Sequence, residues 1–450
     1  MLDALKNRVK VKKKNGMKNS QFNTSFFYNG KFVLYNSLNN NFILLEPIVY
    51  ELYQAAAKEN QIDEISKYHE ELYDILLENE IIVKDEVDEV KKVIDLRQKI
   101  DMNEDHYHLT INPTMNCNFK CWYCYESHIK SSKLDNVNLM RITSLIHKET
   151  EKPIKSFTIS WFGGEPLLYY AQNVLPIIKF THERCKEKEI QFLCTFTTNG
   201  YLIDDEMIED FKKYEVNGFQ ITLDGNEEEH NKVRYVHKNK GSYREILENV
   251  FKLCRNNIIV SLRINYTQEK LATVHDIYND LQHLEASARA YLKVDFQRVW
   301  QAEDSKESRE EVLGLMNKFS NDGFKVSAVI SNVDYVRNSC YADKKNHATI
   351  NYDGNVFKCT ARDFDAKNRE GLLNTNGEIE WNEKYYHRLD AKFKNKPCLS
   401  CRLLPICNGG CSQQALEHAK EYCMYDFDED RKTEVVKNKF LLMLNNITVA

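Results

Sequence analysis

Residues 117–124 read CNFKCWYC, and the fold assignment starts from this short stretch. It places three thiols, Cys117, Cys121 and Cys124, on one loop directly after a strand-like run. Loops at the carboxyl ends of strands hold the active site in β/α folds. Three thiolates can hold three corners of a cubane iron–sulfur cluster and leave one iron open, where a metal does chemistry. The alternative is a zinc knuckle whose fourth ligand is missing or is supplied by His128.

The chain around this loop alternates short β-rich runs with helical patterns from about residue 106 to residue 300. Six β/α units in succession predict a parallel sheet with outer helices, either open or closed as a partial barrel. Cys254 falls on the apolar stripe of one such helix, so we expect it to be a core residue. The predicted strands are 108–112, 157–162, 192–198, 218–223, 258–266 and 292–300.

The two flanking regions differ from this pattern. Residues 21–100 predict a hairpin, a further strand, helices over 47–58 and 62–79, and a charged linker helix, which together suggest a winged-helix-like module. Residues 335–425 are rich in cysteine and show little periodicity, so we expect metal to organise them. A final amphipathic helix is predicted over 427–446. The predicted domains are 1–100, 101–330 and 331–450.

Composition narrows the function further. The chain has 13 cysteines in 450 residues, and ten of them fall into spaced clusters. The basic first twenty residues lack an apolar segment behind them, so they predict a frayed tail and not a secretory signal. We therefore expect a cytoplasmic protein whose thiols bind metal. A net charge of −5 argues weakly against a nucleic-acid partner, and no run of about 20 apolar residues predicts a membrane span.

A second motif, Gly163-Gly164-Glu165-Pro166, ends the next predicted strand. Glycines let the backbone approach a small ligand, and a carboxylate beside them can accept hydrogen bonds from an ammonium group. CxxxCxxC followed by GGEP one β/α unit later resembles the radical S-adenosylmethionine (SAM) superfamily. The resemblance implies that the open iron binds the methionine moiety of SAM, that Glu165 holds its amino group, and that Tyr123 lies against the adenine.

Polar groups at the ends of later strands fit the same resemblance. Taken singly, most of them read as turn or capping residues. Arg263 would point into the barrel, where a buried charge requires an anionic ligand or a carboxylate partner. With Tyr123, the predicted cofactor-binding residues are Gly163, Gly164, Glu165, Thr198, Asn199, Thr222, Asp224, Arg234 and Arg263.

Seven further cysteines follow in the C-terminal region. Four of them alone could form a zinc ribbon, but the order of all seven resembles the SPASM extension of radical SAM enzymes, which carries two auxiliary 4Fe–4S clusters. The first of these clusters has only three evident thiolates, so either Asp343 or His347 completes it or one iron is open, which we favour. The implied ligands are Cys398, Cys401, Cys407 and Cys423 for one cluster and Cys340, Cys359 and Cys411 for the other.

The resemblance implies an enzyme that generates a 5′-deoxyadenosyl radical with an electron from a donor such as flavodoxin or ferredoxin. The leading interpretation is a maturase that crosslinks a ribosomally made precursor peptide and binds its leader at the N-terminal module by adding a strand. A sulfatase-maturase-like enzyme is the alternative, although Thr360 stands where an aspartate is typical there. A zinc-stabilised, non-catalytic peptide-binding scaffold is the third possibility. No general base is predicted.

Overall fold

The computed structural model describes residues 16–237, 240–299, 301–302, 305–328, 336–418 and 420–444. Most of the predicted frayed tail lies outside these ranges. Its last residues are ordered, because strand β1 (Met17–Asn19) pairs with β5 (Ile82–Lys84) in an antiparallel ladder. Within the described ranges, no helix has the length and apolar character needed to cross a bilayer.

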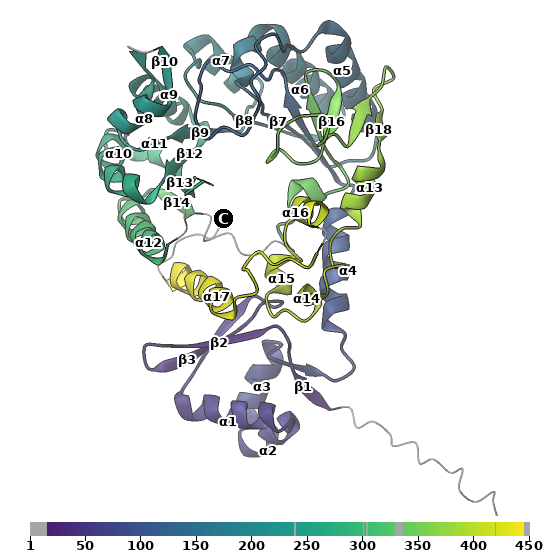
Figure 1. Cartoon of the computed structure of the whole chain (residues 1–450), viewed down its shortest axis with the longest axis vertical. Coiled ribbons are helices and arrows are strands. Elements are labelled where there is room, and N and C mark those ends of the chain that lie inside the picture. The colour runs from purple at the N-terminus through teal and green to yellow at the C-terminus, as the bar shows by residue number, and fades with distance from the viewer. Residues whose placement is uncertain are drawn as a thin grey trace, which may run out of the picture.

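The centre of the molecule is a curved parallel sheet covered by helices on its outer side (Figure 1). Neighbouring strands pair in chain order, which confirms the predicted succession of β/α units as an open partial barrel. Short β14 was not predicted, because its four residues are too few for a periodic pattern. The parallel strands are β6 (His106–Asn112), β7 (Ser156–Trp161), β8 (Gln191–Thr197), β9 (Gly218–Leu223), β12 (Ile259–Tyr266), β13 (Leu292–Arg298) and β14 (Lys325–Ala328).

The outer helices bury one apolar face each against the sheet. In α9 the predicted stripe is buried, and Cys254 is fully buried within the main core, as expected. A small ladder, β10 (Tyr235–His237) with β11 (Lys240–Gly241), lies outside the sheet. The helices are α5 (Asn136–Thr150), α6 (Leu175–Glu187), α7 (Asp205–Lys213), α8 (Glu227–Val233), α9 (Tyr243–Arg255), α10 (Val274–Leu281), α11 (Ala286–Arg289) and α12 (Lys306–Asn321).

The C-terminal region extends the barrel sheet, which the sequence did not predict. β15 (His347–Asn351) pairs in parallel with β6, and β16, β17 and β18 follow as antiparallel neighbours. These strands have three to five residues each, so they leave little trace in hydropathy. The other elements are β16 (Asn355–Phe357), β17 (Gly371–Leu373), β18 (Ile379–Trp381), α13 (Glu383–Leu389), α14 (Lys396–Leu399), α15 (Leu404–Cys407), α16 (Ser412–Glu417) and α17 (Glu429–Leu444).

The N-terminal region forms its own small core, with the predicted hairpin and third strand in a three-stranded antiparallel sheet. The single helix predicted over 62–79 is wrong, because the chain breaks at His69, whose backbone is extended. The His69 ring caps the following helix by accepting a hydrogen bond from Leu72 N–H. The elements are β2 (Asn23–Tyr28), β3 (Lys31–Asn36), β4 (Asn41–Leu45), α1 (Pro47–Lys58), α2 (Ile65–Tyr68), α3 (Glu70–Glu78) and the linker helix α4 (Glu89–Asp101).

The N-terminal sheet packs against the last helix of the chain (Figure 1). Phe440 of α17 contacts the rings of Phe26, Tyr28 and Phe42, with ring centroids 5.3–5.7 Å apart. The same apolar cluster includes Leu403 and Ile406, which lie between the C-terminal cysteines. The N-terminal module is therefore joined to the C-terminal region by a hydrophobic interface.

Candidate active site

The first cysteine loop leaves the carboxyl end of β6 and is held by the GGEP turn that follows β7. Glu165 N–H donates to the carbonyl of Asn116 (2.8 Å), and Gly164 N–H donates to the carboxylate of Glu126 (2.7 Å). A Cβ atom on Gly164 would lie 2.2 Å from the Asn116 carbonyl oxygen. Sequence reasoning assigned this close approach to a ligand, whereas the structure assigns it to the cysteine loop.

Two of the three thiols of this loop, Cys117 and Cys121, are partly buried, and Cys124 is exposed. Burial, with smaller effects from the charges of Glu165 and Cys121, raises the pKa of Cys117 to about 12. Burial likewise raises the pKa of Cys124 to about 11. Cys117 Sγ accepts a hydrogen bond from Phe119 N–H at 3.4 Å. Thiolates in such a place need a bound cation, so this donor set fits an iron–sulfur cluster.

Glu165 is completely buried beside the loop, on the carboxyl-end side of the sheet. Its carboxylate accepts from Thr198 Oγ1–H (2.7 Å), Asn199 N–H (2.8 Å) and Leu167 N–H (3.0 Å). Burial raises the pKa of Glu165, and these hydrogen bonds oppose the rise. Asn199 also donates from its side chain to Asn118 Oδ1 (2.7 Å), within the cysteine loop. The predicted residues of β7 and β8 therefore lie together and brace the cysteine loop.

A second group of predicted residues meets at the ends of β9 and α8. The Tyr123 hydroxyl donates to Asp224 (2.7 Å) and accepts from Arg234 (2.7 Å) and from Asn265 (3.2 Å). Burial alone would raise the pKa of Asp224, but its ion pair with Arg234 and the Tyr123 hydroxyl hold it below the usual range. Thr222 is buried two residues before Asp224. This network fixes the Tyr123 ring, the predicted adenine contact, at the edge of a cavity.

That cavity, about 470 Å³ in volume, occupies the inside of the barrel. Arg263 reaches into it and has the carboxylate partner that its burial required: Asp295 lies 3.8 Å away, and Gln220 accepts from Arg263 at 2.9 Å. Further polar residues line the inner face of the strands, and the sequence analysis did not list them as site residues. They recur at every second position of a strand, and this alternation could have identified them. They include His108, Thr110, Ser160, Gln220, Asn265 and Gln297.

Within each predicted C-terminal set, cysteines influence one another's pKa. Beyond the effect of burial, Cys359 raises the pKa of Cys340, and Cys411 raises the pKa of Cys359. In the other set, Cys398 and Cys401 raise the pKa of Cys407 in the same way. A cavity of about 40 Å³ is lined by this second set, Cys398, Cys401, Cys407 and Cys423.

Backbone donors to sulfur recur in both C-terminal sets. Ala361 N–H donates to Cys359 Sγ and Tyr425 N–H donates to Cys423 Sγ, each at 3.4 Å, as Phe119 does in the first loop. Within the described residues, no three His, Cys, Asp or Glu side chains converge on a point as they would around one metal ion. Backbone donors to cysteine sulfur fit iron–sulfur clusters, whose sulfurs accept such hydrogen bonds.

The two residues predicted as a possible fourth ligand of the first auxiliary cluster have other partners. Asp343 forms a buried ion pair with Lys392 at 2.5 Å. His347 shares a hydrogen bond of 3.2 Å with the Thr110 hydroxyl, and its other ring nitrogen has no partner. Among the described residues, these contacts leave His347 Nδ1 and Asp343 Oδ1 without a hydrogen-bond partner, so the completed cluster and the favoured open iron both stay predictions.

Comparison with known proteins assigns the central region. The radical SAM superfamily matches residues 111–281, which span the cysteine loop, the GGEP turn and both hydrogen-bond networks described above. The chain contains a radical SAM domain. A domain of this superfamily implies an enzyme that uses SAM and a 4Fe–4S cluster.

Relatives of this radical SAM chain include the cysteine-type anaerobic sulfatase-maturating enzyme of Clostridium novyi, 26% identical over 40% of this chain and 46% of the relative. The radical SAM cyclopropyl synthase TigE of Paramaledivibacter caminithermalis is 25% identical over 66% of this chain and 65% of TigE. The chain thus spans less than two thirds of either relative. Streptococcus suis SuiB bound to S-adenosylmethionine shares the fold, with a TM-score of 0.51, 15% identity, and coverage of 90% of this chain and 97% of SuiB.

Proposed function

We propose that this chain is a radical SAM enzyme that modifies a ribosomally made precursor peptide and carries two auxiliary 4Fe–4S clusters. The observation that carries the proposal is the barrel cavity. It is bordered on one side by the first cysteine loop and on another by the C-terminal cysteine set that includes Cys340 and Cys359. Tyr123, from the first cysteine loop, lines one side, and Tyr341 and Thr360 line another. These last two residues directly follow Cys340 and Cys359. A side chain held there would lie between the two sites.

The first cluster would be held by Cys117, Cys121 and Cys124, and when bound with SAM it would supply the radical that abstracts a hydrogen atom from the substrate. The chain's own groups would position the reactants. Glu165 would accept from the amino group of SAM, and Asp224 with Arg234 would hold the Tyr123 ring in place. Trp161, Phe162 and Val299, the apolar part of the cavity wall, would help to exclude water from the radical.

A peptide substrate is supported by the character of the relatives and of the N-terminal module. SuiB is known in a complex with the precursor peptide SuiA. In the present chain, β4 pairs with β3 on one side, and no described strand pairs with its other edge. Leu44 on β4 and Ile48 at the start of α1 are 52% and 73% exposed. An extended leader peptide could add to this edge and cover both side chains.

The test replaces Leu44 and Ile48 together by aspartate and measures turnover of a precursor peptide encoded beside the gene. Burying two aliphatic side chains is worth about 3 kcal/mol or more, so KM for the precursor should rise at least tenfold. Formation of 5′-deoxyadenosine without peptide should not change. Tyr68→Asp is the matched control, because the Tyr68 side chain, at the end of α2, is 77% exposed.

An unchanged KM in the double variant would exclude leader binding at β4. These substitutions are cleaner than deletion of residues 1–100, which would expose the apolar face of α17 around Phe440. The bond formed is identified by mass spectrometry of the product. A formylglycine product would instead support the sulfatase-maturase alternative. The external electron donor and the location in the cell stay predictions from the sequence.

A further inference from the structure

A buried lysine adjoins the cysteine set Cys340, Cys359 and Cys411. Lys358 directly precedes Cys359 and has no solvent exposure. Its ammonium group donates to the carbonyls of Lys344 (2.5 Å) and His347 (2.6 Å). It also lies 5.6 Å from the ring centres of both Trp381 and Tyr385, which are stacked on each other. Among the described residues, Lys358 forms no ion pair with a carboxylate.

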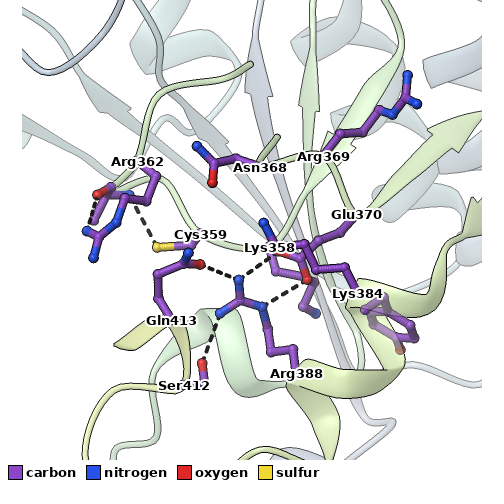
Figure 2. Close-up of polar contacts among 12 residues, drawn as sticks. Lys358, Cys359, Arg362, Asn368, Arg369, Glu370, Lys384, Arg388, Ser412 and Gln413 are labelled. Atoms are coloured by element: carbon purple, nitrogen blue, oxygen red, sulfur yellow. Dashed lines mark hydrogen bonds and ion pairs between the residues drawn. The ribbon is translucent and has the colours of Figure 1, made fainter. Parts of the chain in front are cut away.

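The other buried cations of this region are already neutralised. Arg388 forms two hydrogen bonds with the carboxylate of Glu370, at 2.9 and 2.7 Å, and is fully buried (Figure 2). It also donates to Ser412 (3.0 Å) and Gln413 (2.5 Å), the residues that follow Cys411 (Figure 2). Arg388 therefore holds the segment that follows Cys411, and its charge is balanced by Glu370.

Lys392 is paired in the same way. It forms the buried ion pair with Asp343, three residues after Cys340. Three buried cations thus lie around the set. Arg388 acts on Cys359 and Lys392 acts on Cys340, while Lys358 precedes Cys359 in the chain and interacts with Cys340. Glu370 and Asp343 balance two of the three. One positive charge, that of Lys358, is left over.

An uncompensated buried ammonium is unfavourable, so an anion close to Lys358 would stabilise its charged form. The polar atoms around it are carbonyls, which favour the ammonium without cancelling its charge. A 4Fe–4S cluster with three thiolates is anionic, and it gains one further negative charge on reduction. A fixed cation close to it stabilises the reduced form and raises the reduction potential.

We propose that Lys358 is the counter-charge of the auxiliary cluster held by Cys340, Cys359 and Cys411, and that it makes this cluster easier to reduce than the other auxiliary cluster. The inference rests on the proposed function, because it assumes that both clusters are present. At the second set the lining cation, Lys432, is already paired with Glu429 at 2.5 Å. The two clusters should therefore differ in potential.

The experiment is an anaerobic redox titration, followed by electron paramagnetic resonance, of the full-length, iron-reconstituted chain. The background substitutions C117A, C121A and C124A leave only the auxiliary clusters, and iron content is measured first. Iron for fewer than two clusters would refute the proposed auxiliary sites, which is a separate failure from that of the present inference.

K358M should make reduction of one auxiliary cluster at least tenfold less favourable, a shift of about 59 mV to lower potential, and leave the other unchanged. K358R, which keeps the charge, should restore the original value. K384M is the matched control, because Lys384 lies in the same region (Figure 2). Unlike Lys358, it is partly exposed, and it donates to the Lys367 carbonyl at 2.9 Å. The reduction potentials of both auxiliary clusters in K384M should match those of the otherwise unmodified chain.

Two results would overturn the inference: equal potentials in K358M and K358R, or an equal shift of both auxiliary clusters in K358M. If K358M does not take up iron, K358Q is judged by the same criteria, because it keeps a neutral donor for the two carbonyls. None of these readouts depends on peptide turnover.

Discussion

Replacing Gly164 by alanine tests whether the GGEP turn serves to dock the cysteine loop. Gly164 has a φ of +50°, where an L-residue costs about 1–2 kcal/mol. The added Cβ would lie 2.2 Å from the Asn116 carbonyl oxygen, a backbone atom that no rotamer change can move. The turn and the loop must therefore separate.

This separation would break the hydrogen bonds from Glu165 N–H to Asn116 and from Gly164 N–H to Glu126. Each is worth about 1 kcal/mol net, so the G164A variant should lose about 3–4 kcal/mol of unfolding free energy in total. SAM affinity of the reconstituted protein should fall as well, because Glu165 moves with the turn.

The assay is urea unfolding of the unreconstituted protein, with SAM binding measured by calorimetry after reconstitution. Gly314→Ala in α12 is the control: nothing lies within 4 Å of its added Cβ, and alanine in a helix should stabilise by about 0.5–1 kcal/mol. A G164A variant that keeps both its unfolding free energy, within about 0.5 kcal/mol, and its SAM affinity would refute the docking role.

Two further predictions concern the network around Asp224. Burial lowers the pKa of His230 to about 3, so the unfolded chain takes up the proton first and stability is lost as pH falls from 6.5 toward 3. That loss is about 2 kcal/mol at pH 5, and H230Q should abolish it in urea unfolding compared between pH 7.5 and pH 5; an unchanged pH dependence would contradict the assignment. D224N should weaken SAM binding at least tenfold, because it releases the Tyr123 hydroxyl and leaves Arg234 unpaired. The control D276N, at an exposed carboxylate, should leave SAM binding unchanged. Equal SAM affinities of D224N and the unmodified chain would exclude the positioning role of Asp224.

The sequence predicted the barrel well because its strands are long and its helices are amphipathic. The predicted strands agree with β6, β7, β8, β9, β12 and β13 to within two residues at the ends that the structure describes. The short strands β14 to β18 were missed, since three to five residues carry no readable period. The break at His69 was also missed, because a cap formed by a histidine ring is rare and the apolar spacing continues across it.

Spacing on the chain also predicted which cysteines come together, but not what surrounds them. The predicted grouping of Cys359 with Cys411 is supported by the effect of Cys411 on the pKa of Cys359, and it stays a prediction. Lys358 gave no signal of its own, since a lysine after a strand is usually exposed. Its burial depends on Trp381 and Tyr385, which lie more than twenty residues away and are brought in by β18 and α13. Such long-range packing has no local signature in the sequence.

The predicted boundary near residue 330 marks a change from periodic to cysteine-rich sequence. In the structure, the regions before and after it meet around the cavity. The Tyr125 hydroxyl, next to Cys124, donates to the carbonyl of Thr360 (2.6 Å), next to Cys359. Ser127 N–H donates to Asp363 (2.9 Å) on the same two segments. The loop of the radical SAM domain is thus tied directly to the first C-terminal cysteine set. A shift in one of these segments moves the other, so the barrel and the C-terminal region form one structural unit around the cavity.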